Sequence, residues 1–378
     1  MDADDLDLDR VIDELNAVGS RPAVSGNSGR LQHWLERLLE VGGSDLFLVA
    51  GAPAALRING QVTPLDANPL AADEIEDVVL PCLSERERDA WRRTHSVDLS
   101  LRAGSRRRFR VNLHRERGRP AVAIRALPSE VPQLAALGFS HPIDVLTRLT
   151  RGLVLVCGPT GSGKTTTLAA LVAEINRRER RHIITIEDPI EYEHRHEQSV
   201  VEQQEVGIDV PDFSSALRAA LRQSPDVIVV GEMRDPETMR LALAAAETGH
   251  LVFTTLHAGD PAAAVGRLVD GFPAERQGTV RQELAMALAA ILVQGLLPRA
   301  QGPGRVPYAE LLLASLGARQ HIRKNQLQHL TQEITITRKL GSFSLEESLA
   351  RLTETGVVDR SAALLRAAYP EELKKLLE

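Results

Sequence analysis

Two patterns of apolar and polar positions divide the chain. From Leu31 to Val41 apolar residues recur at helical spacing, and two glycines then end the predicted helix. Short runs with alternating apolar and polar residues follow up to Leu127, as expected of an antiparallel sheet. After Gly152, runs of β-branched residues alternate with helical stretches rich in alanine and leucine. This second pattern is typical of a parallel sheet, so the chain is predicted to be α/β with a smaller α+β domain in front.

These runs predict individual elements. In the first part, strands are expected at Leu46–Val49, Leu56–Ile58, Arg108–Leu113 and Ala121–Leu127, with a turn at Asn59–Gly60. In the second part, they are expected at Leu153–Cys157, His182–Ile186, Asp226–Val230 and Leu251–Thr255. A helix is expected after each of these strands except the second, which runs into a longer irregular segment. The C-terminal part is predicted to be helical, with a capping box at Ser344–Glu347 and a helix end at Gly356.

Segment boundaries follow from composition and turn residues. We expect an acidic flexible tail over residues 1–30, because that stretch is charged and then rich in small residues. The α+β domain is placed at 31–127, a linker beginning with Pro128 at 128–150, the main domain at 151–340 and C-terminal helices at 341–378. A length of 378 residues allows two domains of about 150 residues or more.

Composition excludes several classes of protein. A formal charge of −6 with 43% hydrophobic residues is ordinary for a globular protein. Two cysteines, Cys82 and Cys157, are too few for a disulfide framework or a four-cysteine zinc site. The longest uncharged stretch, Leu284–Pro298, is shorter than the ~20 apolar residues that a membrane-spanning helix needs. We therefore expect a cytoplasmic protein without a membrane span.

The strongest chemical signal is a phosphate loop between a predicted strand and a predicted helix. It reads Gly158, Pro159, Thr160, Gly161, Ser162, Gly163, Lys164 and Thr165, and Thr166 continues into the helix. Glycines let backbone N–H groups turn inward around phosphates, and the helix N-terminus adds positive potential. Lys164 is expected to reach the β- and γ-phosphates, and the Thr165 hydroxyl to ligate Mg²⁺. The predicted ligands are ATP and Mg²⁺.

Carboxylates follow two other predicted strands. Hydrolysis needs a carboxylate on the metal side and a base for the attacking water, and in a parallel sheet such groups lie where strands end. Glu232 follows one strand and is expected on the metal side. Glu187, Asp188 and Glu191 follow another. A solvated loop is the alternative interpretation of this cluster. We expect Glu191 to act as the base, and the other two to shape the loop.

Two histidines flank the strand at Leu251–Thr255. His257 follows the strand, on the side where ligands bind, and is expected to donate a hydrogen bond to the γ-phosphate. The same role is considered for His250, which precedes the strand. A lone histidine is more often a structural hydrogen-bonding group. Zinc is disfavoured because no spacing offers four ligands.

Arginines gather in one predicted hairpin, where only one acidic residue, Glu116, interrupts them. The arginines are Arg102, Arg106, Arg107, Arg108, Arg110, Arg115, Arg117, Arg119 and Arg125. Strand alternation directs Arg108 and Arg110 away from the core, and Arg110 and Arg125 are expected on one surface. Three interpretations compete: a solvated basic face, a nucleic-acid groove, and arginines that reach the nucleotide of a neighbouring subunit. Scarce aromatic residues, 3% of the chain, argue against nucleic acid.

Taken together, these motifs resemble the secretion and pilus ATPases, and most closely the type IV pilus retraction (twitching motility) ATPases of the PilT family. The resemblance rests on Arg108–Asn112, the phosphate loop, Thr185–Glu191, Gly231–Asp235 and Ala246–His257. It implies a PAS-like N-terminal domain, a RecA-like P-loop ATPase core, a homohexamer, and work on a pilus through an inner-membrane platform protein at the inner face of the cytoplasmic membrane. It also implies that Glu191 is the general base, Glu232 the Walker B glutamate, and Arg110 and Arg125 trans-acting arginines.

Assignment within the family depends on further features. Pilus-assembly and type II secretion ATPases carry a longer N-terminal region and a four-cysteine zinc insertion, which this sequence lacks. Gly317–Arg323 is similar to the helix Ala-Ile-Arg-Asn-Leu-Ile-Arg of the retraction type, with a histidine at the leucine position, and Thr254 stands where that type has glycine. The prediction is a hexameric motor for pilus retraction. Alternatives are an accessory paralogue acting beside another pilus ATPase, an assembly or secretion ATPase, and a nucleic-acid translocase.

Overall fold

The computed structural model describes residues 29–103, 107–233 and 235–378. Nearly all of the predicted acidic tail lies outside the described residues. Arg106 of the predicted hairpin also lies outside them. The chain forms two compact units, one ending at Glu130 and the other beginning at Val131. Each unit is described by itself.

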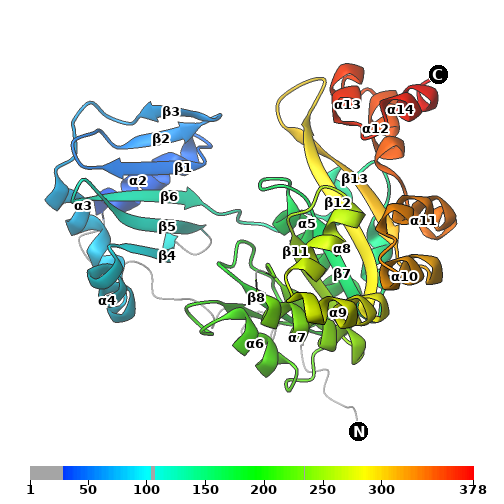
Figure 1. Ribbon diagram of the computed structural model, residues 1–378. Helices are drawn as coiled ribbons and strands as arrows, with labels where there is room; N and C mark the ends of the chain where they lie inside the picture. Colours follow the sequence, from blue (N-terminus) through cyan, green and yellow to red (C-terminus); the bar gives the residue numbers. More distant parts are fainter. Residues whose placement is uncertain (1–28, 104–106, 234) are drawn as a thin grey trace, which may run out of the picture. The chain divides into compact units, whose positions relative to one another are not determined.

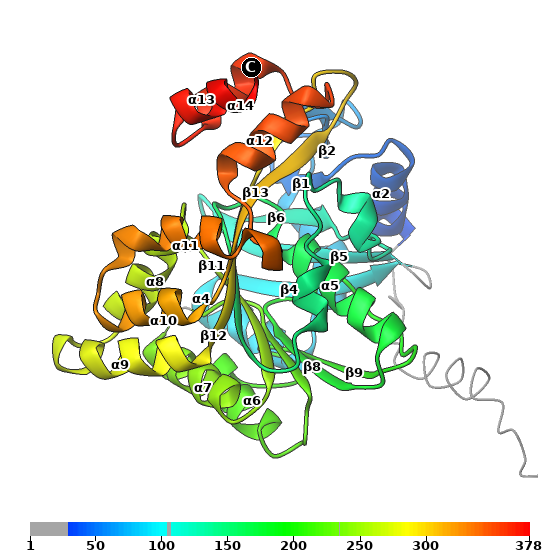
Figure 2. The same ribbon diagram turned by 90° about the vertical axis from the view of Figure 1, so that its right-hand side faces the viewer.

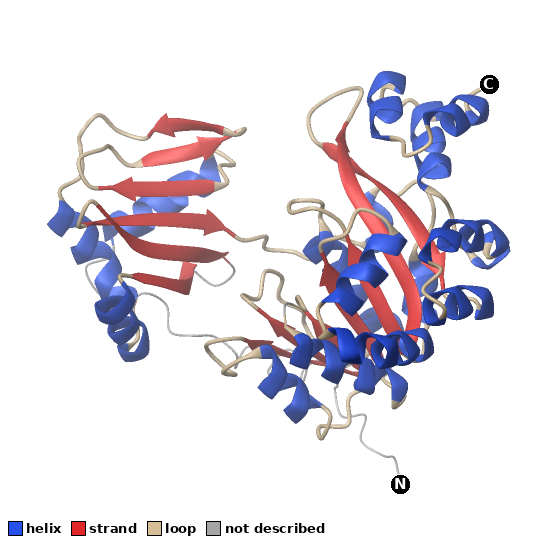
Figure 3. Ribbon diagram, in the orientation of Figure 1, coloured by secondary structure: helices blue, strands red, loops and turns tan. Residues whose placement is uncertain are grey.

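The first unit is an antiparallel sheet with helices on one face. Its six strands have the order β3-β2-β1-β6-β5-β4. They are β1 (Asp45–Val49), β2 (Ala55–Ile58), β3 (Gln61–Pro64), β4 (Ser96–Ala103), β5 (Arg107–Glu116) and β6 (Arg119–Ala126). The helices are α2 (Gly29–Glu40), α3 (Ala72–Val79), the short 3₁₀ helix η1 (Leu80–Cys82) and α4 (Glu85–Thr94). Their apolar side chains and one face of the sheet form a single core. Figures 1 and 3 show the helices on that face of the sheet.

Sequence patterns found only part of this unit. Asn59 and Gly60 have positive φ angles of 50° and 84° and form the predicted turn between β2 and β3. Four elements, β3, β4, α3 and α4, were not predicted. All four residues of β3 are exposed, so the strand carries no apolar alternation. Among the described residues of α4 only Trp91 is buried, so this helix has no apolar stripe for the periodicity to reveal.

The second unit is a seven-stranded sheet with the order β13-β12-β7-β11-β10-β8-β9. Its strands are β7 (Gly152–Cys157), β8 (His182–Glu187), β9 (Val200–Glu205), β10 (Val227–Val230), β11 (Leu251–Leu256), β12 (Leu288–Pro298) and β13 (Arg305–Leu313). All neighbouring strands are parallel except β12 and β13, which form an antiparallel hairpin at one edge. A mainly parallel sheet with buried strands matches the predicted pattern.

Helices cover both faces of this sheet. They are α5 (Lys164–Arg178), α6 (Phe213–Ala220), α7 (Pro236–Glu247), α8 (Pro261–Asp270), α9 (Ala274–Ala287), α10 (Leu316–Arg323), α11 (Leu330–Ile336), α12 (Leu345–Glu354), α13 (Arg360–Arg366) and α14 (Pro370–Leu376), with 3₁₀ turns η2 (Leu134–Leu137), η3 (Asp144–Arg148), η4 (Leu327–His329) and η5 (Arg338–Leu340). One core joins α5 and η3 to the sheet, and another joins α6 to α11 to it. These two groups of helices lie on opposite faces of the sheet (Figure 2). A smaller core joins α12, α13 and α14 to β13.

Two predictions about this unit need correction, one about the segment after β8 and one about the linker. Strand β9 lies within the segment expected to be irregular, and the uncharged stretch before Pro298 is largely the long strand β12. Residues 131–150 of the expected linker pack into the second unit, where Ile143 and Leu146 are buried in the core beside α5. The predicted capping box is present, because Ser344 Oγ accepts from the backbone N–H of Glu347 at the start of α12.

Candidate active site

Four strand ends bring the predicted site residues to one edge of the second sheet. Val230 at the end of β10 pairs with Ile186 of β8 and Thr254 of β11, and Leu256 of β11 pairs with Cys157 of β7. The phosphate loop, the Glu187–Glu191 segment, Glu232 and His257 therefore all leave the sheet at the same edge. This is the side on which parallel α/β sheets bind ligands.

The phosphate loop joins β7 to α5 in a form suited to an anion. Helix α5 begins at Lys164, and its N-cap residue Gly163 has no side chain to accept hydrogen bonds from the first turn. The backbone N–H groups of that turn are thus left for a ligand. Lys164 Nζ donates to the carbonyl oxygens of Gly158 at 2.9 Å and Pro159 at 3.0 Å. Burial lowers the pKa of Lys164, and the Glu232 carboxylate opposes that shift.

Close packing against strand β12 fixes the start of the loop. Gly158 has a φ of +148°, and a Cβ there would lie 2.2 Å from the backbone oxygen of Gln294. Only glycine fits this position. Gln294 Nε2 also donates to the Ser162 carbonyl oxygen at 2.8 Å. Sequence reasoning missed Gln294, although a single amide inside an apolar run was a detectable signal.

The segment after β8 is held by buried hydrogen bonds. Glu187 Oε1 accepts from Thr185 Oγ1 at 2.7 Å and from Gln203 Nε2 at 3.1 Å. Burial raises the pKa of Glu187, those two hydrogen bonds lower it, and the charge of Glu191 raises it further. Gln203 also donates to the Tyr192 carbonyl oxygen at 2.9 Å. Gln203 on β9 therefore anchors Glu187 and Tyr192, the residues on either side of Glu191. Sequence reasoning did not identify Gln203.

A second contact ties the same segment to the phosphate-loop helix. The Tyr192 hydroxyl lies 3.0 Å from Thr166 Oγ1, in the first turn of α5. Tyr192 was not predicted as a site residue. This hydrogen bond fixes the segment that carries Glu191 beside the start of α5, where the phosphates of a nucleotide would lie.

Glu232 and His257 form a pair. His257 Nε2 lies 3.5 Å from Glu232 Oε1. The strand ends that carry them are joined, because Thr255 Oγ1 donates to the Gly231 carbonyl oxygen at 2.6 Å. His250 is different: it precedes β11, and its Nδ1 lies 2.9 Å from the Ala245 carbonyl oxygen. A six-residue strand spans about 20 Å, so the proposed γ-phosphate role of His250 within its own subunit was wrong.

Arg110 and Arg125 lie directly opposite each other on β5 and β6 of the first unit. Arg125 Nε donates to Asp45 Oδ1 at 2.9 Å, and Arg110 Nη2 lies 3.7 Å from Asp98 Oδ1. Both side chains are on the sheet face opposite the apolar core, as strand alternation predicted. Arg108 is only 8% exposed, although the core side chains of β5 are Phe109, Val111 and Leu113.

The second unit's loop fits a nucleotide. At Gly158 the backbone packs too closely against β12 for any side chain, and the N-cap residue of α5 is a glycine, which leaves the first N–H groups of the helix without a side-chain cap. The hydroxyl of Ser162 is buried, and no residue that the structure describes hydrogen-bonds to it. No group of three histidine, cysteine or carboxylate side chains gathers as a metal site in the described parts of the chain. A divalent cation at Thr165 and Glu232 would therefore take phosphate oxygens and water among its ligands, as Mg²⁺ does in nucleotide sites.

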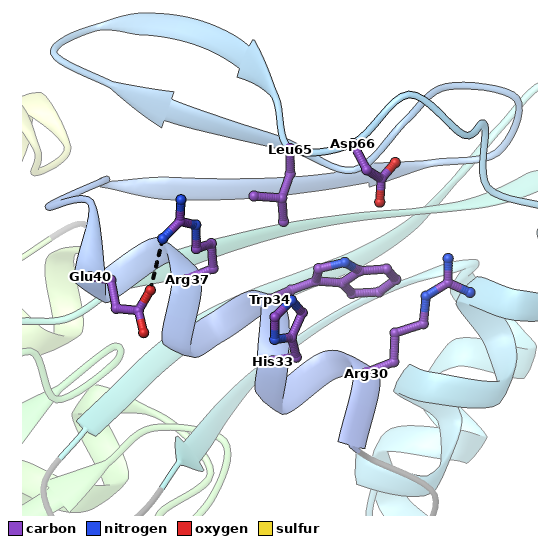
Figure 4. A pocket seen from close by; sticks show the side chains of 7 residues that line it. All are labelled: Arg30, His33, Trp34, Arg37, Glu40, Leu65 and Asp66. Atoms are coloured by element: carbon purple, nitrogen blue, oxygen red, sulfur yellow. Dashed lines mark hydrogen bonds and ion pairs between the residues drawn. The ribbon is translucent and has the colours of Figure 1, made fainter.

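A groove of about 410 Å³ on the first unit was considered as a second site (Figure 4). It lies along α2 and is lined by Arg30, His33, Trp34, Arg37, Glu40, Leu65 and Asp66. Its two guanidinium groups are already engaged. Arg37 Nη1 donates to Glu40 Oε2 at 3.0 Å, while Arg30 pairs with Glu74 and stacks 4.8 Å from the Trp34 ring centroid. The groove therefore offers no evident binding chemistry.

Comparisons with known proteins identify the family. A model of the family described as type II/IV secretion system protein matches residues 94–354, which is more than half of the chain. The chain belongs to this family. The type IV pilus ATPase PilU of Pseudomonas aeruginosa is 37% identical over 344 residues, covering 91% of this chain and 90% of PilU. The type IV pilus retraction ATPase PilT of the same organism is 39% identical over 330 residues, covering 87% and 96%.

A solved structure agrees. The crystal structure of the pilus retraction motor PilT with bound ADP matches with a TM-score of 0.83 and 41% identity, covering 91% of this chain and 99% of that one. This confirms the predicted fold class, a RecA-like ATPase core with a smaller PAS-like domain, and the chain is an ATPase of this family. Among the described residues, no helix combines the length and the apolar character needed to cross a membrane.

Proposed function

We propose that this chain is the subunit of a homohexameric motor that couples ATP hydrolysis to type IV pilus retraction. The observation that carries the proposal is the meeting of the phosphate loop, the Glu191 segment and the Glu232–His257 pair at one sheet edge. Similarity to the retraction ATPase PilT over 96% of its length supports the cellular role. The motor would act on an inner-membrane platform protein at the inner face of the cytoplasmic membrane.

Each site residue has a role in this proposal. The phosphate loop from Gly158 to Thr166 binds ATP, with Lys164 on the β- and γ-phosphates. Thr165 and Glu232 would hold Mg²⁺, which would offset the phosphate charge. Glu191 accepts a proton from the attacking water, and His257 contacts the γ-phosphate. Arg110 and Arg125 are supplied by a neighbouring subunit.

The proposal is tested by replacing the expected base. Glu191→Gln keeps the size and polarity of the side chain but cannot accept the proton of water, so ATP turnover should fall by about 10²- to 10⁴-fold while ADP affinity stays unchanged. Glu193→Gln, two residues further along, is the matched control and should hydrolyse ATP normally. Steady-state turnover and ADP titration measure both effects. Full turnover in Glu191→Gln would contradict the assignment of the base.

The same variants test the cellular role. Deleting the gene in its own host should leave surplus immobile pili, and only the Glu193→Gln variant should restore normal numbers. Bald cells would indicate an assembly motor and contradict retraction.

A second candidate is an accessory retraction role beside another pilus ATPase. It is favoured by the 37% identity to PilU, which covers 90% of that protein. In that case the deletion phenotype would be weaker, because the other ATPase still retracts pili, while the Glu191→Gln result would be unchanged.

A further inference from the structure

Gln294 is a buried amide in an otherwise apolar strand. It lies on β12, pairs with Ala309 of β13, and has a side chain that is 2% exposed. Burying an amide costs free energy unless its hydrogen bonds are made. Gln294 Nε2 donates to the Ser162 carbonyl oxygen at 2.8 Å, across 132 residues of sequence. The amide therefore faces the phosphate loop instead of the core.

This hydrogen bond fixes the direction of one peptide plane. The peptide between Ser162 and Gly163 is planar and trans, so its C=O and N–H point in opposite directions. With the carbonyl oxygen held toward β12, the Gly163 N–H points away from Gln294. Gly163 is also the N-cap of α5, where N–H groups converge on an anion.

Gln294 touches both ends of the loop. A Cβ at Gly158 would lie 2.2 Å from its backbone oxygen, and a Cβ at Gly163 would lie 3.4 Å from its Nε2. Gln294 thus restricts the backbone position at Gly158, where the loop begins, and at Gly163, where it continues into α5.

We propose that Gln294 is a positioning residue for the nucleotide phosphates: by holding the Ser162 carbonyl, it aims the Gly163 N–H at the phosphate cradle. Gln294 acts through the loop and does not touch the nucleotide itself. The inference rests on the proposed use of this loop for ATP. It assigns a role in phosphate binding to a residue of β12, outside the sequence motif of the loop.

The test is the affinity for ADP and AMP of the full-length protein with Gln294→Met, which keeps the side-chain length and removes the amide. ADP binding should weaken about tenfold, or about 1.4 kcal/mol, because the β-phosphate loses an aligned donor. AMP, which lacks the β-phosphate, should lose less than twofold. The melting temperature without nucleotide should change little, because the lost hydrogen bond to the Ser162 carbonyl oxygen is offset by removal of the buried Oε1 of Gln294, which is unpaired among the described residues.

A second variant and two controls complete the design. Gln294→Glu keeps the shape but, when ionised, has no donor, so it should lose ADP affinity at least as strongly. Ile291→Val on the same strand should lower the melting temperature slightly and leave ADP affinity unchanged. Equal loss of AMP and ADP affinity, an unchanged ADP affinity in Gln294→Met, or an equal loss in Ile291→Val would overturn the inference. Lys164→Ala distinguishes the two proposals, because normal ADP binding in that variant would contradict the nucleotide site itself.

Discussion

Glu310 has a strongly raised pKa, although it lies on β13, the strand at one edge of the second sheet. It lies on β13 opposite Val293. Burial and, to a smaller extent, the carboxylates of Asp260 and Glu346 raise the pKa of Glu310 to about 8, although the Arg366 guanidinium opposes the shift. The protonated form is therefore favoured in the folded protein. Asp260 is also the N-cap residue of α8, three residues after His257.

The shift of Glu310 predicts a pH dependence of stability. Its folded-state pKa of about 8 lies above the usual 4.5, so its contribution to stability is full below pH 4.5 and is lost as the pH rises to about 8. Glu310→Gln should remove that loss, and between pH 5.5 and 7 its free energy of unfolding should fall less steeply than that of the wild type, by about 1.4 kcal/mol per pH unit. Urea unfolding at several pH values measures it. Parallel pH profiles would contradict the assignment.

At the scale of elements, α10 is organised around a carboxylate from α11. Glu333 Oε2 accepts from Ser315 Oγ, the N-cap of α10, and Glu333 Oε1 lies 3.5 Å from His321 Nε2. A Cβ at Gly317 would lie 2.3 Å from the same Oε1. The resemblance to the retraction-type helix implies alanine and leucine at the positions of Gly317 and His321. Both departures are thus explained by one buried acid, which needs space and a partner.

Replacing Gly317 by alanine tests whether the Glu333 carboxylate leaves room for a side chain at this position. Gly317→Ala should lower the free energy of unfolding by about 1–3 kcal/mol, because the new methyl group displaces the Glu333 carboxylate from its partners. Gly278→Ala in α9, where a Cβ meets nothing within 4 Å, is the matched control and should raise stability by up to ~1 kcal/mol. Thermal unfolding of both variants measures the contrast. A stable Gly317→Ala protein would show that the carboxylate moves freely.

At the scale of the whole molecule, the proposed catalytic groups are divided between two compact units. The phosphate loop and its acids belong to the unit that begins at Val131, while Arg110 and Arg125 belong to the unit that ends at Glu130. If these arginines act on a neighbour's nucleotide, each active site requires two subunits. Arginines supplied in this way are worth about 10³- to 10⁵-fold in rate.

Mixed assemblies test this division. Lys164→Ala and Arg110→Ala should each be nearly inactive alone, yet mixing their subunits should recover part of the ATP turnover, because some sites then join an intact loop to an intact arginine. Lys164→Ala mixed with Glu232→Ala is the matched control and should recover nothing, since both changes damage the same cradle. The turnover of refolded mixtures measures recovery. If rings proven to contain both variants recovered no ATP turnover, Arg110 would not act at the nucleotide of a neighbouring subunit.

The sequence by itself determined the phosphate loop, the strands that precede the acids and the facing pair of arginines. These features depend on spacing within a few residues: a strand, a turn and a helix start for the loop, and strand alternation for Arg110 and Arg125. For the same reason, a resemblance carried by contiguous motifs was enough to predict the family.

The tertiary structure decided which distant residues support those motifs. Gln294 reaches Ser162 only because β12 lies beside β7, and Gln203 holds Glu187 only because β9 lies beside β8. Local patterns do not specify the order of strands in a sheet, because that order is set by burial of both faces at once. Contacts that depend on it therefore appear only in the folded chain.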